Sequence, residues 1–283
     1  PEVRVEGNLI GNYTLNQRQR RKLERQLGEE GDEFFVRRNR LNVREVELGL
    51  RSAVDPFARF EAIVSAEQDF GGELKVGLEE GFLTSSALPG GLHLKLGKFR
   101  TGFGEFNDSD PEEIPQVDPP NVIRNVFGRS GEGWLDTGLA LTRRFGVTDD
   151  LSFLLWGAAF NGDNEAAFHG GRAGAARRPA WFGRLESFLE LAQTTGLEGS
   201  VGFAEGRAAD EQGRARLRSR ILSAHLELQH HDPLLALYRG VNLLGEFFYT
   251  WRDRFREPNE VDPQERRETL GRFGLYTLGE ARI

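Results

Sequence analysis

The side chains in this sequence that could do chemistry are charged residues placed at every second position of apolar runs. Glu45 and Glu47 alternate with Val46 and Leu48, and the same spacing recurs in later segments. Because successive side chains of a strand point to opposite faces, this spacing predicts strands with one apolar face and one charged face. A charged face can line a water-filled interior that small polar solutes enter. The candidates for such a lining are Glu45, Glu47, Arg51, Arg59, Glu61, Lys75, His93, Lys95, His225, Glu227, Glu246 and Arg252.

The candidate lining residues carry both signs of charge, which allows two interpretations. A pore lined by one sign selects ions of the opposite sign, whereas acidic and basic residues on neighbouring strands neutralise each other across a sheet. Neutralisation across the sheet is the more frequent arrangement. A separate basic group could attract anions such as phosphate, although a strand end in water or among lipid headgroups explains part of it equally well. The anion-attracting candidates are Lys98, Arg100, Arg124 and Arg129.

Motifs typical of enzymes are missing from the sequence. There is no phosphate-binding glycine loop, dinucleotide fingerprint or nucleophile elbow, and zero cysteines exclude disulfides and thiol chemistry. The five histidines show no metal-ligand spacing, and the many carboxylates single out no acid pair for hydrolysis. With 37 Lys+Arg against 44 Asp+Glu, the net charge of −7 argues against nucleic-acid binding. We predict no catalytic residue, no cofactor, no metal site and no enzymatic activity.

The elements that must position these charges are predicted to be strands, because period-two alternation dominates and helical periodicity is scarce. Long polar connections, notably near 14–40, 102–132 and 161–180, alternate with short turns. Outer-membrane β-barrels show this alternation, with short turns on one side and long extracellular loops on the other. The predicted strands lie near 3–13, 41–53, 57–67, 73–84, 91–101, 133–144, 151–160, 181–191, 197–205, 217–230, 240–252 and 266–278.

These patterns predict an all-β fold: an antiparallel transmembrane β-barrel with about 12 strands in this chain, as a single domain over residues 1–283. The longest stretch without Asp, Glu, Lys or Arg is Gly81–Leu94, shorter than the roughly 20 apolar residues of a membrane helix. A soluble β-sandwich could also carry the alternation by exposing its charged faces, so the loop lengths are what favour the barrel. The helix-like segment 15–31 fits a solvated loop better than a plug or docking element.

The two ends of the chain bear on its completeness. The chain starts at Pro1 and contains no Met, so we expect a mature form after signal-peptide removal or a truncated chain. It ends at Ile283 without a terminal aromatic residue. Because an unclosed barrel would leave unpaired strand edges in lipid, either the barrel closes at about twelve strands or the complete protein has more.

Two motifs after the fourth predicted strand are fairly specific: GKFR at 97–100, and PQVD at 115–118 with RN at 124–125. With the segments 41–65 and 131–142, they resemble a family of porin-like bacterial outer-membrane β-barrels, of the phosphate-selective-porin type and also labelled zinc-regulated TonB-dependent outer-membrane proteins. The resemblance implies an outer-membrane barrel with a passive transport role. Members of that family tend to carry a histidine-containing loop after the GKFR strand. Residues 107–113 contain no histidine, so a zinc association is not predicted.

The resulting hypothesis is a porin-like channel of the bacterial outer membrane for passive passage of small solutes, with anions as one candidate class. Outer-membrane lipid and small solutes are the expected partners, and a homo-oligomer or partner subunits are further candidates. Two alternatives remain open. One is a structural or partner-docking barrel within a larger assembly, and the other is a soluble all-β binding or hydrolytic protein.

Overall fold

Twelve antiparallel strands dominate the structure, a computed structural model that describes residues 2–11, 41–68, 74–108, 120–128, 133–168, 179–209, 216–233, 239–256 and 266–282. Each predicted strand is present, with ends that differ by a few residues. The all-β class and the antiparallel arrangement are therefore confirmed. The strands are β1 (Glu2–Gly11), β2 (Leu41–Asp55), β3 (Ala58–Gln68), β4 (Leu74–Leu88), β5 (Leu92–Arg100), β6 (Leu135–Gly146), β7 (Leu151–Phe160), β8 (Ala180–Ala192), β9 (Thr195–Ala209), β10 (Arg216–His231), β11 (Gly240–Arg256) and β12 (Arg266–Arg282).

The strand order in the sheet is the order in the sequence, and consecutive strands commonly pair in this way. The chain divides by its contacts into two compact units, residues 1–82 and 83–283. Short helices interrupt the second unit: a 3-10 turn η1 (Pro89–Gly91), and helices α3 (Glu105–Asp108), α4 (Asn121–Phe127) and α5 (Glu165–Phe168). No helix in the described part of the chain combines the length and the apolar content that crossing a membrane requires.

The first unit holds strands with exposed apolar side chains. Val46, Leu48 and Leu50 of β2 alternate in exposure with their polar neighbours, as the sequence predicts. On β2 and β3, Arg51 stands opposite Glu61, and their side chains form an ion pair of 2.8 Å. Cross-strand neutralisation, one of the two interpretations of the mixed charges, is thus observed at this pair.

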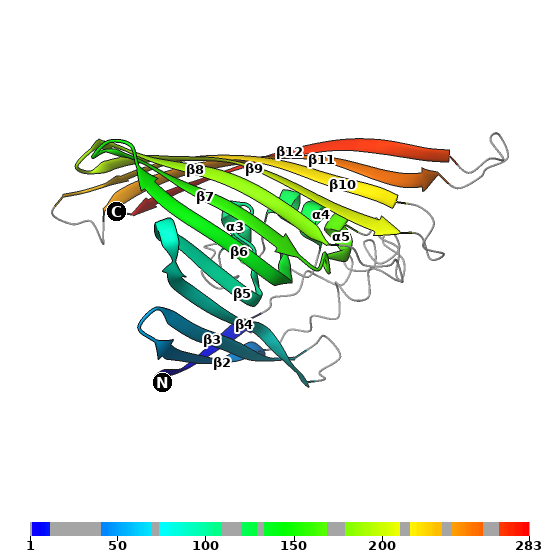
Figure 1. Cartoon of the computed structure of the whole chain (residues 1–283), viewed down its shortest axis with the longest axis horizontal. Coiled ribbons are helices and arrows are strands. Elements are labelled where there is room, and N and C mark those ends of the chain that lie inside the picture. The colour runs from blue at the N-terminus through cyan, green and yellow to red at the C-terminus, as the bar shows by residue number, and fades with distance from the viewer. Residues whose placement is uncertain are drawn as a thin grey trace. The chain divides into compact units, whose positions relative to one another are not determined.

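Strands β6–β12 of the second unit lie side by side in one sheet (Figure 1), and the two faces of this sheet differ chemically. The inner face carries buried side chains such as Phe182, Ile221 and Phe248. The outer face carries exposed apolar side chains, including Leu226, which is 57% exposed, and Phe273, which is 79% exposed. The alternation of the sequence therefore produces the two faces directly, because neighbouring residues of a strand point to opposite sides.

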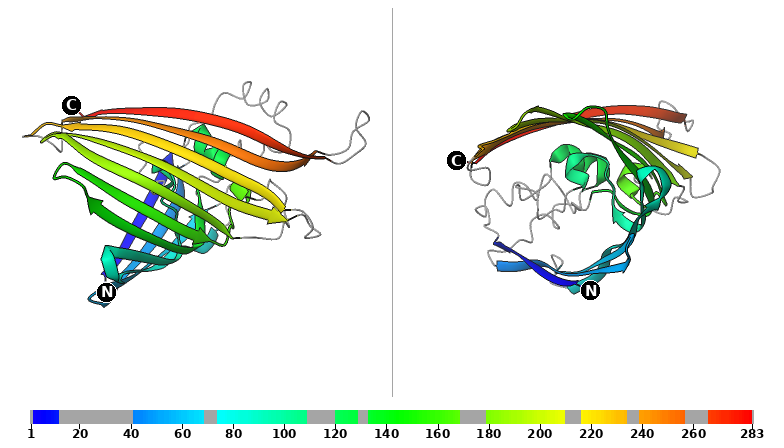
Figure 2. Two further views of the ribbon diagram at one scale, coloured as in Figure 1. Left: turned by 45° about the horizontal axis from the view of Figure 1, so that its top comes forward. Right: turned by 60° about the vertical axis from the view of Figure 1, so that its left-hand side comes forward.

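The connections of the second unit fold against the inner face. Figure 2 shows α4 and α5 on the concave side of the sheet formed by β6–β12. Phe103 and Phe127 from the connection after β5 and Phe168 from the connection after β7 are buried, and each packs against the ring of Trp134. Gly206 of β9 permits this approach, because a Cβ atom there would collide with the Phe168 ring.

The connection predicted near 102–132 thus contributes to the core in its described parts, 101–108 and 120–128. The helix-like segment 15–31 and the connection near 14–40 lie outside the described residues. That the three long connections are extracellular loops, and that the chain is one domain, stay predictions.

Candidate functional site

A row of polar side chains crosses the inner face over five strands. The pairing places Glu186 opposite Ser200, Ser200 opposite His225, His225 opposite Glu246, and Glu246 opposite Tyr276. Because residues directly opposite in a ladder share a face, these side chains form one belt across β8–β12. Glu246, the member of the belt on β11, is completely buried. This belt, on a face that also carries buried aromatic side chains, is the candidate functional site.

The connection after β5 is held against this belt by hydrogen bonds. Arg184 donates from Nη1 to the Gly102 carbonyl oxygen at 3.0 Å, and the Glu105 amide donates to Glu246 Oε1 at 3.1 Å. Gly104 adopts a φ of 96°, and a Cβ there would lie 2.9 Å from Glu246 Oε1. Only glycine combines this backbone conformation with such a close approach. The connection is therefore fitted to Glu246.

A second set of hydrogen bonds holds the connections after β5 and after β7 beside the start of β6. Asn107 donates to the Thr101 carbonyl oxygen at 2.7 Å and to its hydroxyl at 2.8 Å, and it accepts from the Trp134 amide. Asp136 accepts from the amides of Gly162 at 3.0 Å and Asp163 at 2.9 Å. These buried groups have partners, which is what keeps a turn of backbone stable inside an apolar core.

Negative charge exceeds positive charge around the belt. Arg184 Nη2 lies 3.0 Å from Glu186 and 3.8 Å from Glu105, and His225 Nε2 lies 3.4 Å from Glu227. Burial raises the pKa of the Glu105 carboxyl above its ordinary value, and the nearby charge of Arg184 acts in the opposite direction. An excess of carboxylates attracts cations. We call this group the acidic cluster: Glu105, Glu186, Glu198, Glu227 and Glu246, with Arg184 and His225.

Three members of the acidic cluster could hold a metal ion. Glu105, Glu198 and His225 each offer one ligand atom, and these atoms lie within 4.8 Å of one another. They come from α3, β9 and β10. Within the part of the chain that the structure describes, Nδ1 of His225 has no hydrogen-bond partner, although the residue is only 5% exposed.

Replacing Tyr276 with phenylalanine tests the belt. The Tyr276 hydroxyl donates a hydrogen bond to Glu246 Oε2, and its ring contacts Phe106. Because the acceptor is a buried carboxyl group, we expect Tyr276→Phe to lower the free energy of unfolding by about 1.5–3 kcal/mol in urea titrations of the detergent-folded protein. Tyr249→Phe, on the other face of the adjacent β11, is the control and should change it by less than about 0.5 kcal/mol. Equal effects of the two changes would contradict the role of this hydrogen bond.

Three of the predicted lining residues lie in the acidic cluster, and the others lie outside it. His225, Glu227 and Glu246 lie in the acidic cluster. Arg252 donates to the Val126 carbonyl oxygen of α4 at 2.8 Å, and Lys95 Nζ lies 4.6 Å from the centroid of the Phe99 ring. The remaining ones are His93, exposed at the start of β5; Arg59 and Lys75, exposed in the first unit; Glu47, half-buried there; the Arg51–Glu61 pair; and Glu45, whose side chain lies outside the described residues.

The predicted anion-attracting residues are not brought into the acidic cluster. Arg100 is buried at the end of β5, Lys98 is half-buried near it, and Arg124 is half-buried in α4. Arg129 lies outside the described residues. Their attraction for anions stays a prediction. The sequence reasoning missed six members of the site, namely Glu105, Arg184, Glu186, Glu198, Ser200 and Tyr276.

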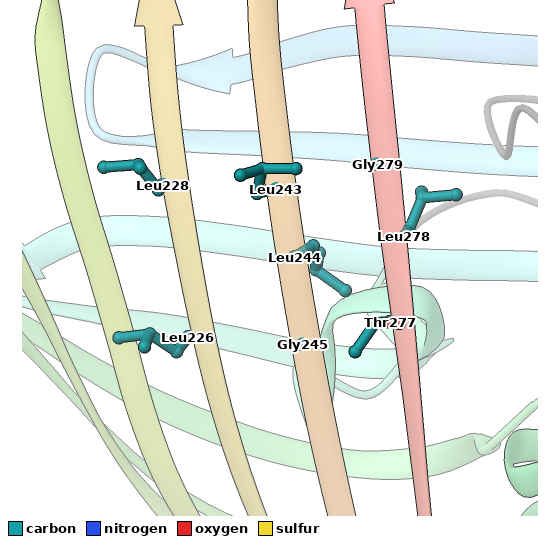
Figure 3. Close-up of a pocket in the computed structure, with 8 residues that line it drawn as sticks. All are labelled: Leu226, Leu228, Leu243, Leu244, Gly245, Thr277, Leu278 and Gly279. Atoms are coloured by element: carbon teal, nitrogen blue, oxygen red, sulfur yellow. The ribbon is translucent and has the colours of Figure 1, made fainter.

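A groove of about 400 Å³ on β10, β11 and β12 differs from the acidic cluster in being lined by apolar residues (Figure 3). Leu226, Leu228 and Leu243 of its lining belong to the outer face and are exposed. Thr277 is the only polar side chain in its lining. The groove therefore lacks the polar groups that orient a substrate or ligate a metal, and the acidic cluster remains the candidate site.

Comparisons with known proteins give a relative and several structural likenesses. No family model matches the chain. An uncharacterized protein of Aquifex aeolicus (strain VF5) is 32% identical over 269 residues, which cover 88% of this chain and 53% of that protein. The chain thus spans about half the length of the curated relative that it matches.

The solved structures that resemble it are bacterial outer-membrane proteins. One is OmpT of Vibrio cholerae in its trimer form, with 8% identity, a TM-score of 0.40, and coverage of 86% of this chain and 82% of that one. Another is the outer membrane channel DcaP of Acinetobacter baumannii, with 8% identity, a TM-score of 0.31, and coverage of 85% and 86%. Likenesses of this strength leave the function to be argued from the chain's own residues.

Proposed function

We propose that this chain belongs to a β-barrel of the bacterial outer membrane whose polar interior passes small solutes, as a porin does. The observation that carries the proposal is the inverted polarity of the sheet in the second unit. Leu226, Leu243 and Phe273 are exposed on the outer face, whereas Arg184 and Glu246 are buried on the inner face. A soluble sheet would present its charges to water and bury its leucines. A lipid-facing sheet shows the opposite.

The length of the apolar band supports a membrane location. On the outer face of β11, Val241, Leu243, Gly245, Phe247, Tyr249 and Trp251 follow one another without a charge. This stretch has about the 9–11 residues that a tilted strand needs to cross a bilayer. The stretch ends with two aromatic residues, Tyr249 and Trp251, whose ring centroids lie 4.3 Å apart. Aromatic residues at the end of a strand are typical of a membrane interface.

The size of the solutes that could pass depends on the segment that lies inside the sheet. Residues 101–108 and α4, which we call the interior segment, lie against the inner face. Passage beside them would be narrow and would suit small solutes. The acidic cluster borders this segment and favours cations at its level. Anion preference, predicted from the basic residues, is the opposite outcome of the same experiment.

Conductance in planar lipid bilayers tests this function. We expect the folded protein to conduct, and the reversal potential in a KCl gradient to show a preference for cations. Glu198→Gln in the acidic cluster should lower that preference, whereas Glu190→Gln, exposed near the end of β8, should leave it unchanged. Folded protein without conductance would contradict an open channel, and full β content without detergent would contradict the membrane location.

A second candidate is a structural barrel closed by its own connection. Phe103 and Phe127 are buried beside the inner face, and their rings contact each other. This favours the second candidate, because the two rings fill space that a solute would need. Wild-type protein that inserts into bilayers without conducting would support this function over the first.

A further inference from the structure

The acidic cluster contains a set of ligands whose chemistry fits a metal ion. We propose that Glu105, Glu198 and His225 bind a divalent transition-metal ion inside the second unit. Their ligand atoms lie within 4.8 Å of one another. A tetrahedral ion with bonds of about 2.1 Å holds its ligands roughly 3.4 Å apart, so a small inward movement of half-buried glutamates completes the site. The ion would bind whether or not the interior conducts, so the inference goes beyond the proposed function.

His225 gives the argument that is independent of the carboxylates. Its side chain is fully buried, and its Nε2 lies 3.4 Å from Glu227 Oε2, whereas its Nδ1 has no hydrogen-bond partner among the described residues. A buried polar group without a partner is costly, so natural proteins rarely keep one without a use for it. A metal ion would provide the missing partner.

Glu227 supplies the second partner that metal-bound histidines usually have. Its Oε2 lies 3.4 Å from His225 Nε2, and its Oε1 accepts from Gln229 Nε2 at 2.8 Å. A carboxylate on one ring nitrogen fixes the tautomer and the ring orientation, which leaves the other nitrogen for the ion. Glu227 is therefore a positioning residue, and Nδ1 is the ligand atom that we assign to His225.

The surrounding charges accept an added dication. Among the described residues, Arg184 is the arginine that forms ion pairs with the acidic cluster, and it is already engaged with Glu186 at 3.0 Å and with the Gly102 carbonyl oxygen. Within that part of the chain, the carboxylates of Glu198, Glu227 and Glu246 exceed what Arg184 alone can neutralise. One imidazole with two carboxylates suits a first-row transition metal, whereas Ca²⁺ and Mg²⁺ prefer ligand sets made of oxygen.

The site would also have a structural consequence. Glu105 comes from the connection after β5, whereas Glu198 and His225 come from the sheet. An ion shared by them joins the connection to the inner face, so it adds a cross-link that the unfolded chain lacks. Metal binding should therefore raise the thermal stability of the folded protein.

Zn²⁺ titration of the full chain tests the proposal. The protein is folded in detergent, freed of metal with a chelator, stripped of any affinity tag, and titrated with Zn²⁺ alone by calorimetry. We expect saturable binding, and we expect His225→Gln and Glu198→Gln each to weaken it by at least about 100-fold, since even outer partners cost up to that much. Glu227→Gln should weaken it by roughly 10- to 100-fold. Ca²⁺ should bind more weakly than Zn²⁺.

The control is His231→Gln, because His231 is exposed beside His230 at the end of β10, where a surface ion could bind. The expected result is unchanged Zn²⁺ binding. The proposal is overturned if the wild type binds no Zn²⁺, if His225→Gln binds as the wild type does, or if His231→Gln removes the binding. Circular dichroism checks each variant, and Glu198→Gln decides the matter if His225→Gln does not fold, because Glu198 is only half-buried.

Discussion

Replacing Trp134 with alanine is expected to lower the free energy of unfolding by about 3–5 kcal/mol. Its side chain is fully buried, and its ring lies 4.8 Å from that of Phe168, 5.7 Å from that of Phe182 and 5.8 Å from that of Phe103, centroid to centroid. These rings come from the sheet and from two different connections, so they cannot all move to fill the space. The loss therefore combines burial of apolar surface with an unfilled cavity.

Trp181→Ala provides the matched control for this experiment. Trp181 is 46% exposed on the outer face of β8, so its removal opens no cavity in the core. Urea unfolding of the detergent-folded variants, followed by circular dichroism, should show a much smaller loss for Trp181→Ala. Brominated lipid should quench the fluorescence of Trp181 more strongly than that of Trp134. A similar loss of stability for the two variants would show that the interior core does not carry the fold.

Replacing Arg184 with leucine is expected to cost about 3–5 kcal/mol of unfolding free energy, because removal of one partner leaves buried charge uncompensated. The Arg184 side chain is 2% exposed, and its partner Glu186 is 19% exposed. Arg184 also holds the Gly102 carbonyl oxygen at 3.0 Å. The same change should therefore release the interior segment, and any channel should then conduct with larger and noisier currents.

Arg51→Leu tests whether burial is the reason why the Arg184–Glu186 ion pair contributes to the free energy of unfolding. The Arg51–Glu61 pair has a shorter separation, 2.8 Å, but its side chains are 58% and 24% exposed. An exposed pair of this kind contributes about 0–1 kcal/mol. Urea unfolding of the two variants under one condition compares them directly. An Arg51→Leu loss as large as the Arg184→Leu loss would contradict the role that we assign to burial.

The strands could be predicted from the sequence because their signal is local. Val46, Leu48 and Leu50 already show the apolar face of β2 within a few residues, and the structure leaves all three exposed. The same reasoning placed His225, Glu227 and Glu246 on the polar face of their strands, where the structure buries them. Alternation depends only on strand geometry, so it needs no knowledge of the rest of the chain.

The site could be predicted only in part. Glu198 stands opposite Glu227 on the inner face, but that pairing depends on the register of β9 with β10, which alternation leaves open. Glu105 carried no signal, because it lies in a connection whose path depends on Gly104, Arg184 and Glu246 far along the chain. Glu105 lies close to His225 in space, but the two residues are so far apart in the sequence that a local pattern cannot predict their contact.

The sequence by itself determined the twelve strands and the two faces of strands such as β2 and β11, because a side chain's face follows from its position in the strand. Only the tertiary structure decided that the connection after β5 packs inside, that the cluster around His225 is acidic, and that Nδ1 of His225 lacks a hydrogen-bond partner among the described residues. The reason is that these features depend on strand register and on contacts between distant segments. Free energies of packing, not local propensities, select among the many paths that a polar connection can take.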